Sequence, residues 1–221
     1  DRGKRIAEIM ILGPEKKDIC DLEDVILKGS DWWILKFIRE LDDLILHLRT
    51  NELEIGVLVI KSKGNIENVN LITRTLINNK NNWFINETIG FIRRTLSRLD
   101  VSSRSIFTVV DNNSCFGGFL SELIFCADRS FMLNNAIVKN GVEGPYISLC
   151  ELNFELLEMA NGQTRLATRF NEDNIKGVIK LASLLFKKFA SSIKFFIKIK
   201  IKNIPETKKI FFKNFFNRYC L

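Results

Sequence analysis

Hydrophobic residues recur at helical spacing in two long stretches of the chain. From Trp33 to Leu48 the apolar positions are three or four residues apart, with charged side chains between them. A second pattern of this kind runs from Phe84 to Leu99. Both stretches are predicted to form amphipathic helices, each of which buries one face.

Compact apolar runs between the polar segments predict strands. Three such runs are found, at 54–60 (EIGVLVI), 105–110 (SIFTVV) and 128–133 (DRSFML). A turn, KSKGN, follows the first run, and a polar loop is expected at 134–144. Beyond it we expect a short extended piece from Tyr146 and a helix that starts near Asn161 to Thr164. Helices and strands that alternate in this way indicate an α/β protein.

A glycine pair opens the helical segment that follows the run at 105–110. Gly117 and Gly118 precede an apolar stretch in which Glu122 is the first carboxylate. Glycine lets the backbone approach a ligand and adopt dihedrals that are costly for other residues. The free N–H groups at the start of the next helix favour negative charge at the same place. The pair therefore predicts either an anion-stabilising turn or a tight strand-to-helix connection that binds no ligand.

Length and composition narrow the class of protein. With 221 residues and 46% hydrophobic content, the chain fits one soluble globular domain, with or without an appendage. No apolar run approaches the roughly 20 residues of a membrane-spanning helix, and the N-terminal stretch lacks a secretory pattern. The chain begins at Asp1 rather than Met, so we expect it to be a piece of a longer product. The five cysteines form no C-x-x-C pair and there is a single His, which favours a reduced, cytoplasmic protein without a metal site.

The basic excess lies in the last part of the chain. Residues 173–221 hold 12 of the 33 Lys and Arg and two of the 26 Asp and Glu, which leaves 21 basic and 24 acidic residues in 1–172. This Lys-, Phe- and Ile-rich tail includes the strand-like IKIKIK at 197–202. It could bind nucleic acid, an anionic membrane or the phosphates of coenzyme A. The alternative is that the tail is poorly selected sequence, because A+T-rich codons encode the same residue types. We expect no specific nucleic-acid partner.

Four segments together resemble a known family. They are ELDDLILHLRTNELEIG, NETIGFIRRTLSRLDVSSRSIF, SCFGGFLSELIFCADRSFML and ISLCELNFELLEMANGQTRLATRF. In order and with few gaps, they are similar to the second half of enzymes of the benzoyl-CoA-dihydrodiol lyase family, in the crotonase (enoyl-CoA hydratase) superfamily. The similarity covers roughly residues 5–172, and no resemblance is found beyond Glu172.

The resemblance implies a fold and an activity. Residues 1–172 would form a crotonase-like α/β spiral of β-β-α units with flanking helices, and the domain would assemble into a homo-oligomer. The substrate would be an acyl-CoA thioester, with coenzyme A present only as part of that substrate and with no separate cofactor or metal. The reaction of the family is hydrolytic ring opening of 2,3-epoxybenzoyl-CoA with release of formate.

The resemblance also implies site residues. Backbone amides of Gly64, Asn65, Gly117 and Gly118 would form an oxyanion hole, while Glu122 and Glu151 would hold and activate water. Such a carboxylate pair suits general acid and base chemistry, because burial and mutual repulsion shift the two pKa values apart. The alternative is that both glutamates are inherited residues with ordinary partners such as Arg165 or Arg129.

Other candidates favour structural roles, and rival functions remain. His47 is interpreted as a helix-surface residue, Cys115 as a small packed thiol, and Trp32 and Trp33 as anchors of a helix. By this resemblance, the sequence would correspond to the second half of the family enzyme without its front half. The rivals to the lyase are therefore a scaffold that supports oligomer assembly without catalysis and a generic enoyl-CoA hydratase.

Overall fold

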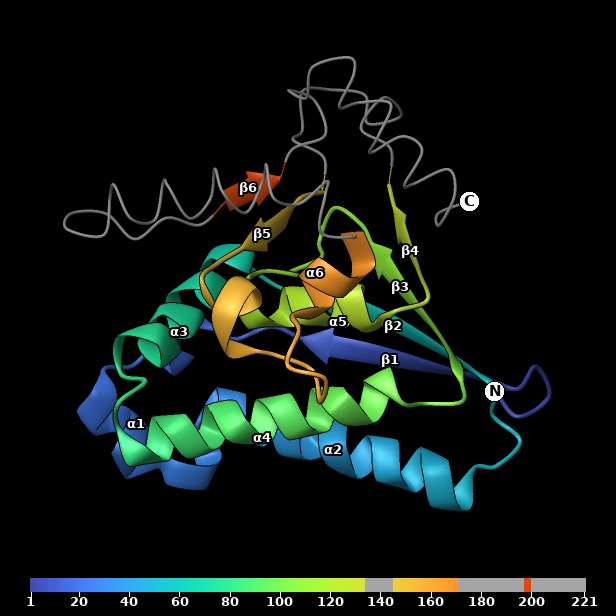
Figure 1. Ribbon diagram of the computed structural model, residues 1–221, viewed down its shortest axis with the longest axis horizontal. Helices are drawn as coiled ribbons and strands as arrows, with labels where there is room; N and C mark the ends of the chain where they lie inside the picture. The colour runs from blue at the N-terminus through green and yellow to red at the C-terminus, as the bar shows by residue number, and fades with distance from the viewer. Residues whose placement is uncertain (134–144, 171–196, 200–221) are drawn as a thin grey trace, which may run out of the picture.

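A parallel sheet wound with helices forms the core of the protein. The computed structural model describes residues 1–133, 145–170 and 197–199. The main sheet has the order β1 (Ile6–Leu12), β2 (Val57–Lys63), β3 (Ser105–Val110) and β4 (Arg129–Met132), with every pair parallel. The strands are connected through α1 (Leu22–Lys28), α2 (Trp33–Asn51), α3 (Ile66–Asn78), α4 (Trp83–Asp100) and α5 (Glu122–Cys126) (Figure 1). The predicted α/β class is confirmed, and the wound parallel sheet agrees with the crotonase-like expectation.

Shorter elements complete the described part of the chain. They are η1 (Lys16–Asp18), η2 (Gly29–Asp31), η3 (Gly118–Ser121), the π-helix η4 (Leu152–Leu156), α6 (Arg165–Phe170), β5 (Ile147–Leu149) and β6 (Ile197–Ile199). β5 and β6 pair antiparallel, so the first half of IKIKIK is a strand as predicted. The rest of the 173–221 tail, the loop at 134–144 and the domain boundary at 172 lie outside the described residues.

The helices cover one face of the sheet. Alternate strand residues such as Ile60 and Ile106 are buried against the helical layer. α2 and α4 run side by side below the sheet (Figure 1) and are joined by an ion pair in which Arg98 Nη1 lies 2.8 Å from each carboxylate oxygen of Asp42. As predicted, Trp32 anchors the start of α2, where its side chain is fully buried and close to Phe84.

Several predicted elements are confirmed and one is displaced. α2, α4 and β3 lie where the sequence patterns predict them. β2 starts at Val57 instead of residue 54, because Ile55 N–H closes a turn onto Glu52 O and the exposed Glu54 pairs with Arg5 at 3.4 Å. In the described residues no helix has the length and apolar character needed to cross a membrane.

Three of the longer elements, β1, α1 and α3, were not predicted from the sequence. α3 is concealed because its buried face carries polar side chains, among them Asn68, Asn70 and Thr73. Asn68 Nδ2 donates to Pro14 O at 3.0 Å, and Thr73 Oγ1 donates to Val69 O at 2.7 Å. Hydrogen bonds of this kind let polar residues occupy a core position that apolar periodicity does not reveal.

Candidate active site

The glycine pair packs directly against α3. Gly118 has a φ of 51°, and a Cβ there would lie 2.8 Å from Thr73 Cβ. A Cβ on Gly117 would lie 2.7 Å from both Asn70 Oδ1 and Ile66 Cγ1. Both glycines are therefore required by close packing, which is the outcome expected for a tight strand-to-helix connection. The oxyanion role of the turn stays a prediction.

Two of the four predicted oxyanion amides already have backbone partners. Gly64 N–H donates to Asn113 O at 3.0 Å, and Gly117 N–H donates to Cys115 O at 2.8 Å. In the part of the chain that the structure describes, the amides of Asn65 and Gly118 donate to no backbone carbonyl. If the turn holds an oxyanion, Asn65 and Gly118 are the donors that remain for it.

The loops at the carboxyl ends of the strands close on one another. Gly13 N–H donates to Lys63 O at 2.9 Å, and Cys115 N–H donates to Ser62 Oγ at 3.0 Å. A Cβ on Gly64 would approach Gly13 Cα to 3.0 Å. This edge of a parallel sheet is where ligands bind in open α/β folds. Tight loop packing makes it a rigid support for such a site.

Cys115 is a packed thiol, as the sequence suggested. Its side chain is fully buried, and burial raises the pKa of the thiol. A protonated thiol without solvent access is a poor nucleophile. His47 lies exposed on α2 with its Nδ1 2.9 Å from Asn51 Nδ2. Among the described residues no group of three or more His, Cys, Asp or Glu is placed to hold a metal ion.

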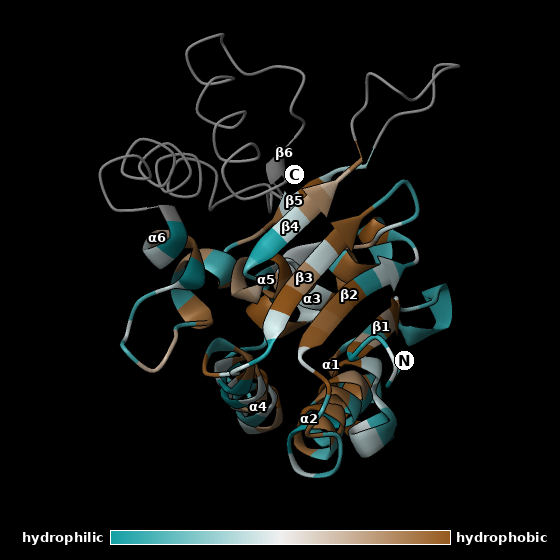
Figure 2. Cartoon of the chain, turned by 90° about the vertical axis from the view of Figure 1, so that its right-hand side faces the viewer, coloured by the Kyte–Doolittle hydropathy of each residue, from teal (hydrophilic) through white to brown (hydrophobic). Residues whose placement is uncertain are grey.

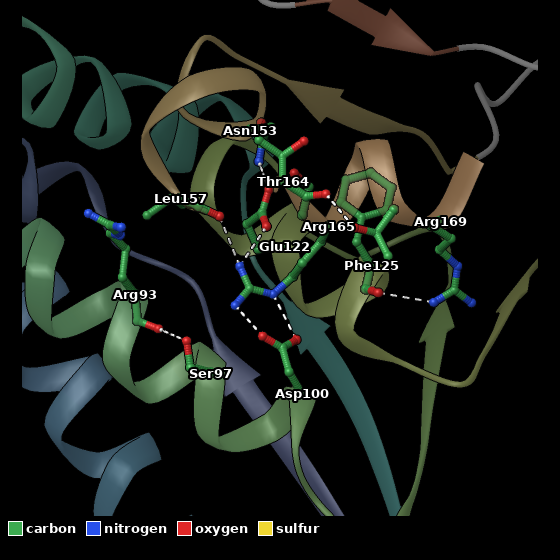
Figure 3. A network of polar contacts seen from close by, with 12 residues as sticks. Arg93, Ser97, Asp100, Glu122, Phe125, Asn153, Leu157, Thr164, Arg165 and Arg169 are labelled. Atoms are coloured by element: carbon green, nitrogen blue, oxygen red, sulfur yellow. Dashed lines mark hydrogen bonds and ion pairs between the residues drawn. The ribbon is translucent and has the colours of Figure 1, made fainter. Parts of the chain in front are cut away.

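Glu122 is enclosed by polar partners (Figure 3). Its side chain has no exposed surface. Asn153 Nδ2 donates to Oε1 at 2.7 Å, and Arg165 Nη1 approaches Oε2 to 3.2 Å. Of the two arginines proposed as ordinary partners, the structure places Arg165 beside the carboxylate. A ligand therefore does not reach Glu122 in this conformation.

Arg165 joins three parts of the chain that are far apart in sequence. Its Nε and Nη2 donate to both oxygens of Asp100, at 2.9 and 2.6 Å. Its Nη1 donates to Leu157 O at 3.0 Å as well as to Glu122. We call Glu122, Asp100, Arg165 and Asn153 the Arg165 cluster. The bidentate pair with Asp100 and the partners at all three guanidinium nitrogens make it a rigid junction between α4, α5 and α6.

Asn153 links the Arg165 cluster to the glycine turn. Its Nδ2 donates to Gly118 O at 3.1 Å as well as to Glu122, and its Oδ1 accepts from Cys150 N–H at 2.9 Å. The Glu122 carboxylate thus fixes the amide of Asn153, which in turn holds the carbonyl of Gly118. Sequence reasoning missed Asn153 and Asp100, since a lone polar residue in one sequence carries no signal of its distant partner.

Glu151 does not join Glu122. Its side chain is 37% exposed and lies 3.7 Å from Lys80 Nζ. The two glutamates therefore have separate partners, and the structure describes no contact between their carboxylates. Of the two, Glu151 is the one that is exposed to solvent. The catalytic roles expected for Glu122 and Glu151 stay predictions.

Two buried polar atoms beside the glycine turn have no hydrogen-bond partner among the described residues. They are Asn70 Oδ1 and Ser148 Oγ, on residues that are 3% and 1% exposed. Asn70 Oδ1 lies next to Gly117, and Ser148 forms a parallel β-bridge with Gly117. Unpaired buried polar groups are costly and are therefore rare. Their position marks the glycine turn as the place where a polar ligand group has partners to meet.

We expect the pH dependence of stability to report on Glu122. Burial raises the pKa of its carboxyl from 4.5 to about 7, although Asn153 and Arg165 act in the opposite direction. A raised folded-state pKa contributes stability that is present below about pH 4.5 and is lost as the pH rises through about 7. The free energy of unfolding, measured with urea from pH 4.5 to 8, should therefore fall less steeply in Glu122→Gln than in the wild type. Parallel curves for the two proteins would contradict a shifted Glu122.

Comparison with known proteins identifies a relative of the chain by sequence. Benzoyl-CoA-dihydrodiol lyase of Aromatoleum evansii is 39% identical over 173 residues, which cover 78% of this chain and 30% of that protein. The chain thus spans less than a third of the length of this curated relative. No protein-family model matches. An enoyl-CoA hydratase from Shewanella pealeana superposes with a TM-score of 0.40 at 14% identity, over 97% of this chain and 91% of that one, a likeness too low to decide the fold. The sequence identity shows that the chain is related to benzoyl-CoA-dihydrodiol lyase, as its motifs predicted.

Proposed function

We propose that the chain is part of a lyase that acts on a benzoyl-CoA-derived thioester. The observation that carries the proposal is the 39% identity to benzoyl-CoA-dihydrodiol lyase over 78% of the chain. The specific reaction would be the hydrolytic opening of 2,3-epoxybenzoyl-CoA expected from the family resemblance. A cytoplasmic location and a homo-oligomeric state belong to the same proposal.

In this proposal the glycine turn polarises the thioester carbonyl. The amides of Asn65 and Gly118 lie in loops that follow neighbouring strands, where donors can converge on one oxygen. Donors held in place before the reaction stabilise the charge that develops on that oxygen, by about 3 to 4 kcal/mol per donor at a dry site. Asn65 is the N-cap of the 13-residue helix α3, whose dipole favours negative charge at the same end.

The two glutamates would act in different ways. Glu122 is fully enclosed and bonds Asn153, so we assign it a positioning role: it holds the Gly118 carbonyl, and with it the turn, through that amide. Glu151 is partly exposed and is the carboxylate that could hold a water. Its ion pair with Lys80 at 3.7 Å would have to open for this purpose.

Calorimetric titration with benzoyl-CoA is the first test, with free coenzyme A and crotonyl-CoA as comparison ligands. We expect binding that prefers the aromatic thioester over free coenzyme A. Asn65→Pro removes the proposed donor N–H, whereas Asn65→Ala keeps it and loses the same side-chain cap on Glu67 N–H. Affinity should fall about tenfold in the proline variant relative to the alanine variant, because a single hydrogen bond to a charged or polarised oxygen is worth roughly 1.5 kcal/mol.

The titration also separates the rival functions. Equal affinity in Asn65→Pro and Asn65→Ala would remove the Asn65 amide from the site. A preference for crotonyl-CoA would favour a generic hydratase. No heat with any ligand, from a chain whose circular dichroism shows it to be folded, would favour the scaffold. The scaffold is the strongest alternative because Glu122 is enclosed and because the chain matches only 30% of the length of its relative.

A further inference from the structure

The face of the main sheet that points away from the helices is largely apolar, and no helix of the described residues covers it. In Figure 2 the four strands lie in front of α3 and α5, and no described helix lies in front of them. Met10 and Leu12 on β1 are 54% and 66% exposed, and Leu133 beyond β4 is 38% exposed. Phe107 and Phe131 are half-buried and pack edge to face, with ring centroids 6.0 Å apart. Parallel sheets are normally covered on both faces, so this open face lacks a partner.

Charge is arranged across this face in a way that a second copy can match. The strand register places Glu8, Val59, Phe107 and Arg129 in one row, from β1 to β4. The row therefore starts with a carboxylate, has two apolar residues in the middle and ends with a guanidinium. Both end residues are exposed, and among the described residues Arg129 has no ion-pair partner.

Consider a twofold axis that runs parallel to the strands, midway between two copies of the sheet and centred between β2 and β3. This axis places each row against the same row of the other copy, in reverse order. Glu8 of one copy then faces Arg129 of the other, twice, and Val59 faces Phe107. The next row holds Met10, Lys61, Val109 and Phe131 in register, and the same axis sets Met10 against Phe131. Self-complementarity about a twofold axis is what an isologous dimer requires.

Lys61 fits the same arrangement. Its ammonium lies 3.3 Å from Glu8 and its side chain is only 31% exposed. The methylene stem therefore lies along the apolar face while the charge stays beside a carboxylate. In a dimer Glu8 would bond both Lys61 of its own chain and Arg129 of the other copy.

From these rows we infer that the uncovered face of the β1–β4 sheet is a dimer interface, with a second copy of this chain packed on it sheet to sheet. Aligned sheets pack about 10 Å apart at an angle of roughly 30°, and the inner side chains of both sheets then fill the space between them. The interface does not depend on the proposed thioester chemistry.

A charge exchange tests the interface in the purified chain. Sedimentation equilibrium at about 5 to 100 μM should give twice the 25.5 kDa mass of one chain. Arg129→Glu sets two carboxylates against each other, and Glu8→Arg does the same with two cations, so each should weaken the dimer at least tenfold. The double variant restores opposite charges and should dimerise at least tenfold more tightly than either single variant. Arg39→Glu, the same change on the exposed side of α2, should leave the dimer unchanged.

Three results would overturn the inference. The first is a wild-type chain that is monomeric at 100 μM, because a second copy then does not cover the face. The second is an oligomer that Arg129→Glu leaves intact, which would move the interface elsewhere. The third is a double variant that is as weak as the single ones.

Discussion

Replacing Arg165 by Met should destabilise the protein by about 3 to 5 kcal/mol at pH 8. The change leaves the Glu122 carboxylate fully buried with Asn153 as its remaining partner, and it removes both hydrogen bonds of Asp100 to the guanidinium. Breaking a buried ion pair by removing one partner is expensive because the other charge stays without compensation. The loss should be smaller at pH 5, where Glu122 can take up a proton, because burial raises its pKa to about 7. Urea unfolding at both pH values measures the difference.

Two further variants isolate the buried charge. Arg165→Met combined with Glu122→Gln should recover part of the stability at pH 8, because a neutral amide costs less to bury than a carboxylate. Arg2→Met removes a guanidinium of the same kind from an exposed pair with Glu52 at 2.6 Å, where the arginine side chain is 82% exposed. That control should change stability little. If Arg165→Met were as mild as Arg2→Met, the Arg165 cluster would not hold α4, α5 and α6 together.

Gly118→Ala should lower the free energy of unfolding by about 3 to 4 kcal/mol or prevent folding. The new Cβ would lie 2.8 Å from Thr73 Cβ and 2.9 Å from Thr73 Cγ2, in a region that is fully packed. Overpacking of this kind costs roughly 1 to 3 kcal/mol. The φ of 51° adds about 1 kcal/mol or more, because a side chain in the left-handed region meets its own backbone.

Gly162→Ala separates the two contributions. Gly162 has a φ of 75°, yet a Cβ there would meet no atom within 4 Å. Its substitution should therefore show the backbone cost alone, about 1 kcal/mol. Thr73→Ala in the Gly118→Ala background removes two of the three nearest atoms and should return part of the loss. Equal effects of Gly118→Ala and Gly162→Ala in thermal or urea unfolding would show that the contact with α3 is not tight.

The sequence pattern predicts best those elements whose apolar face meets an apolar layer. α2 and α4 bury regular stripes, and β3 is an unbroken run between two turns, so all three were predicted correctly. β1 was missed although IAEIMIL is an apolar run, because Glu8 and the basic residues before Ile6 led the whole N-terminal stretch to be treated as polar. α3 was not predicted because its buried face, which packs against the glycine turn, carries polar residues that interrupt the apolar pattern.

The residues of the candidate site also fall into two groups, those that the sequence indicates and those that only the fold reveals. Gly117 and Gly118 could be found from sequence, because only glycine tolerates both the close approach and the positive φ at Gly118. The choice of Arg165 as an ordinary partner of Glu122 was one of two alternatives, and the fold selects it. Asp100 and Asn153 could not be found, since they reach the site only through the packing of α4 and η4 against α5 and η3.

The order of the strands in the sheet has a consequence for how the chain acquires its structure during synthesis. Because β1 to β4 are neighbours in the order in which they are translated, each new strand meets a partner that already exists, and no strand waits for a distant one. Because proteins are synthesised from the N-terminus, β1 and β2 can pair before β3 and β4 are complete. Arg165 is different, since it follows Glu122 by 43 residues and Asp100 by 65. Until Arg165 leaves the ribosome, Glu122 on α5 has no counter-charge. The synthesis of α6 therefore sets the moment at which α4, α5 and α6 can be joined.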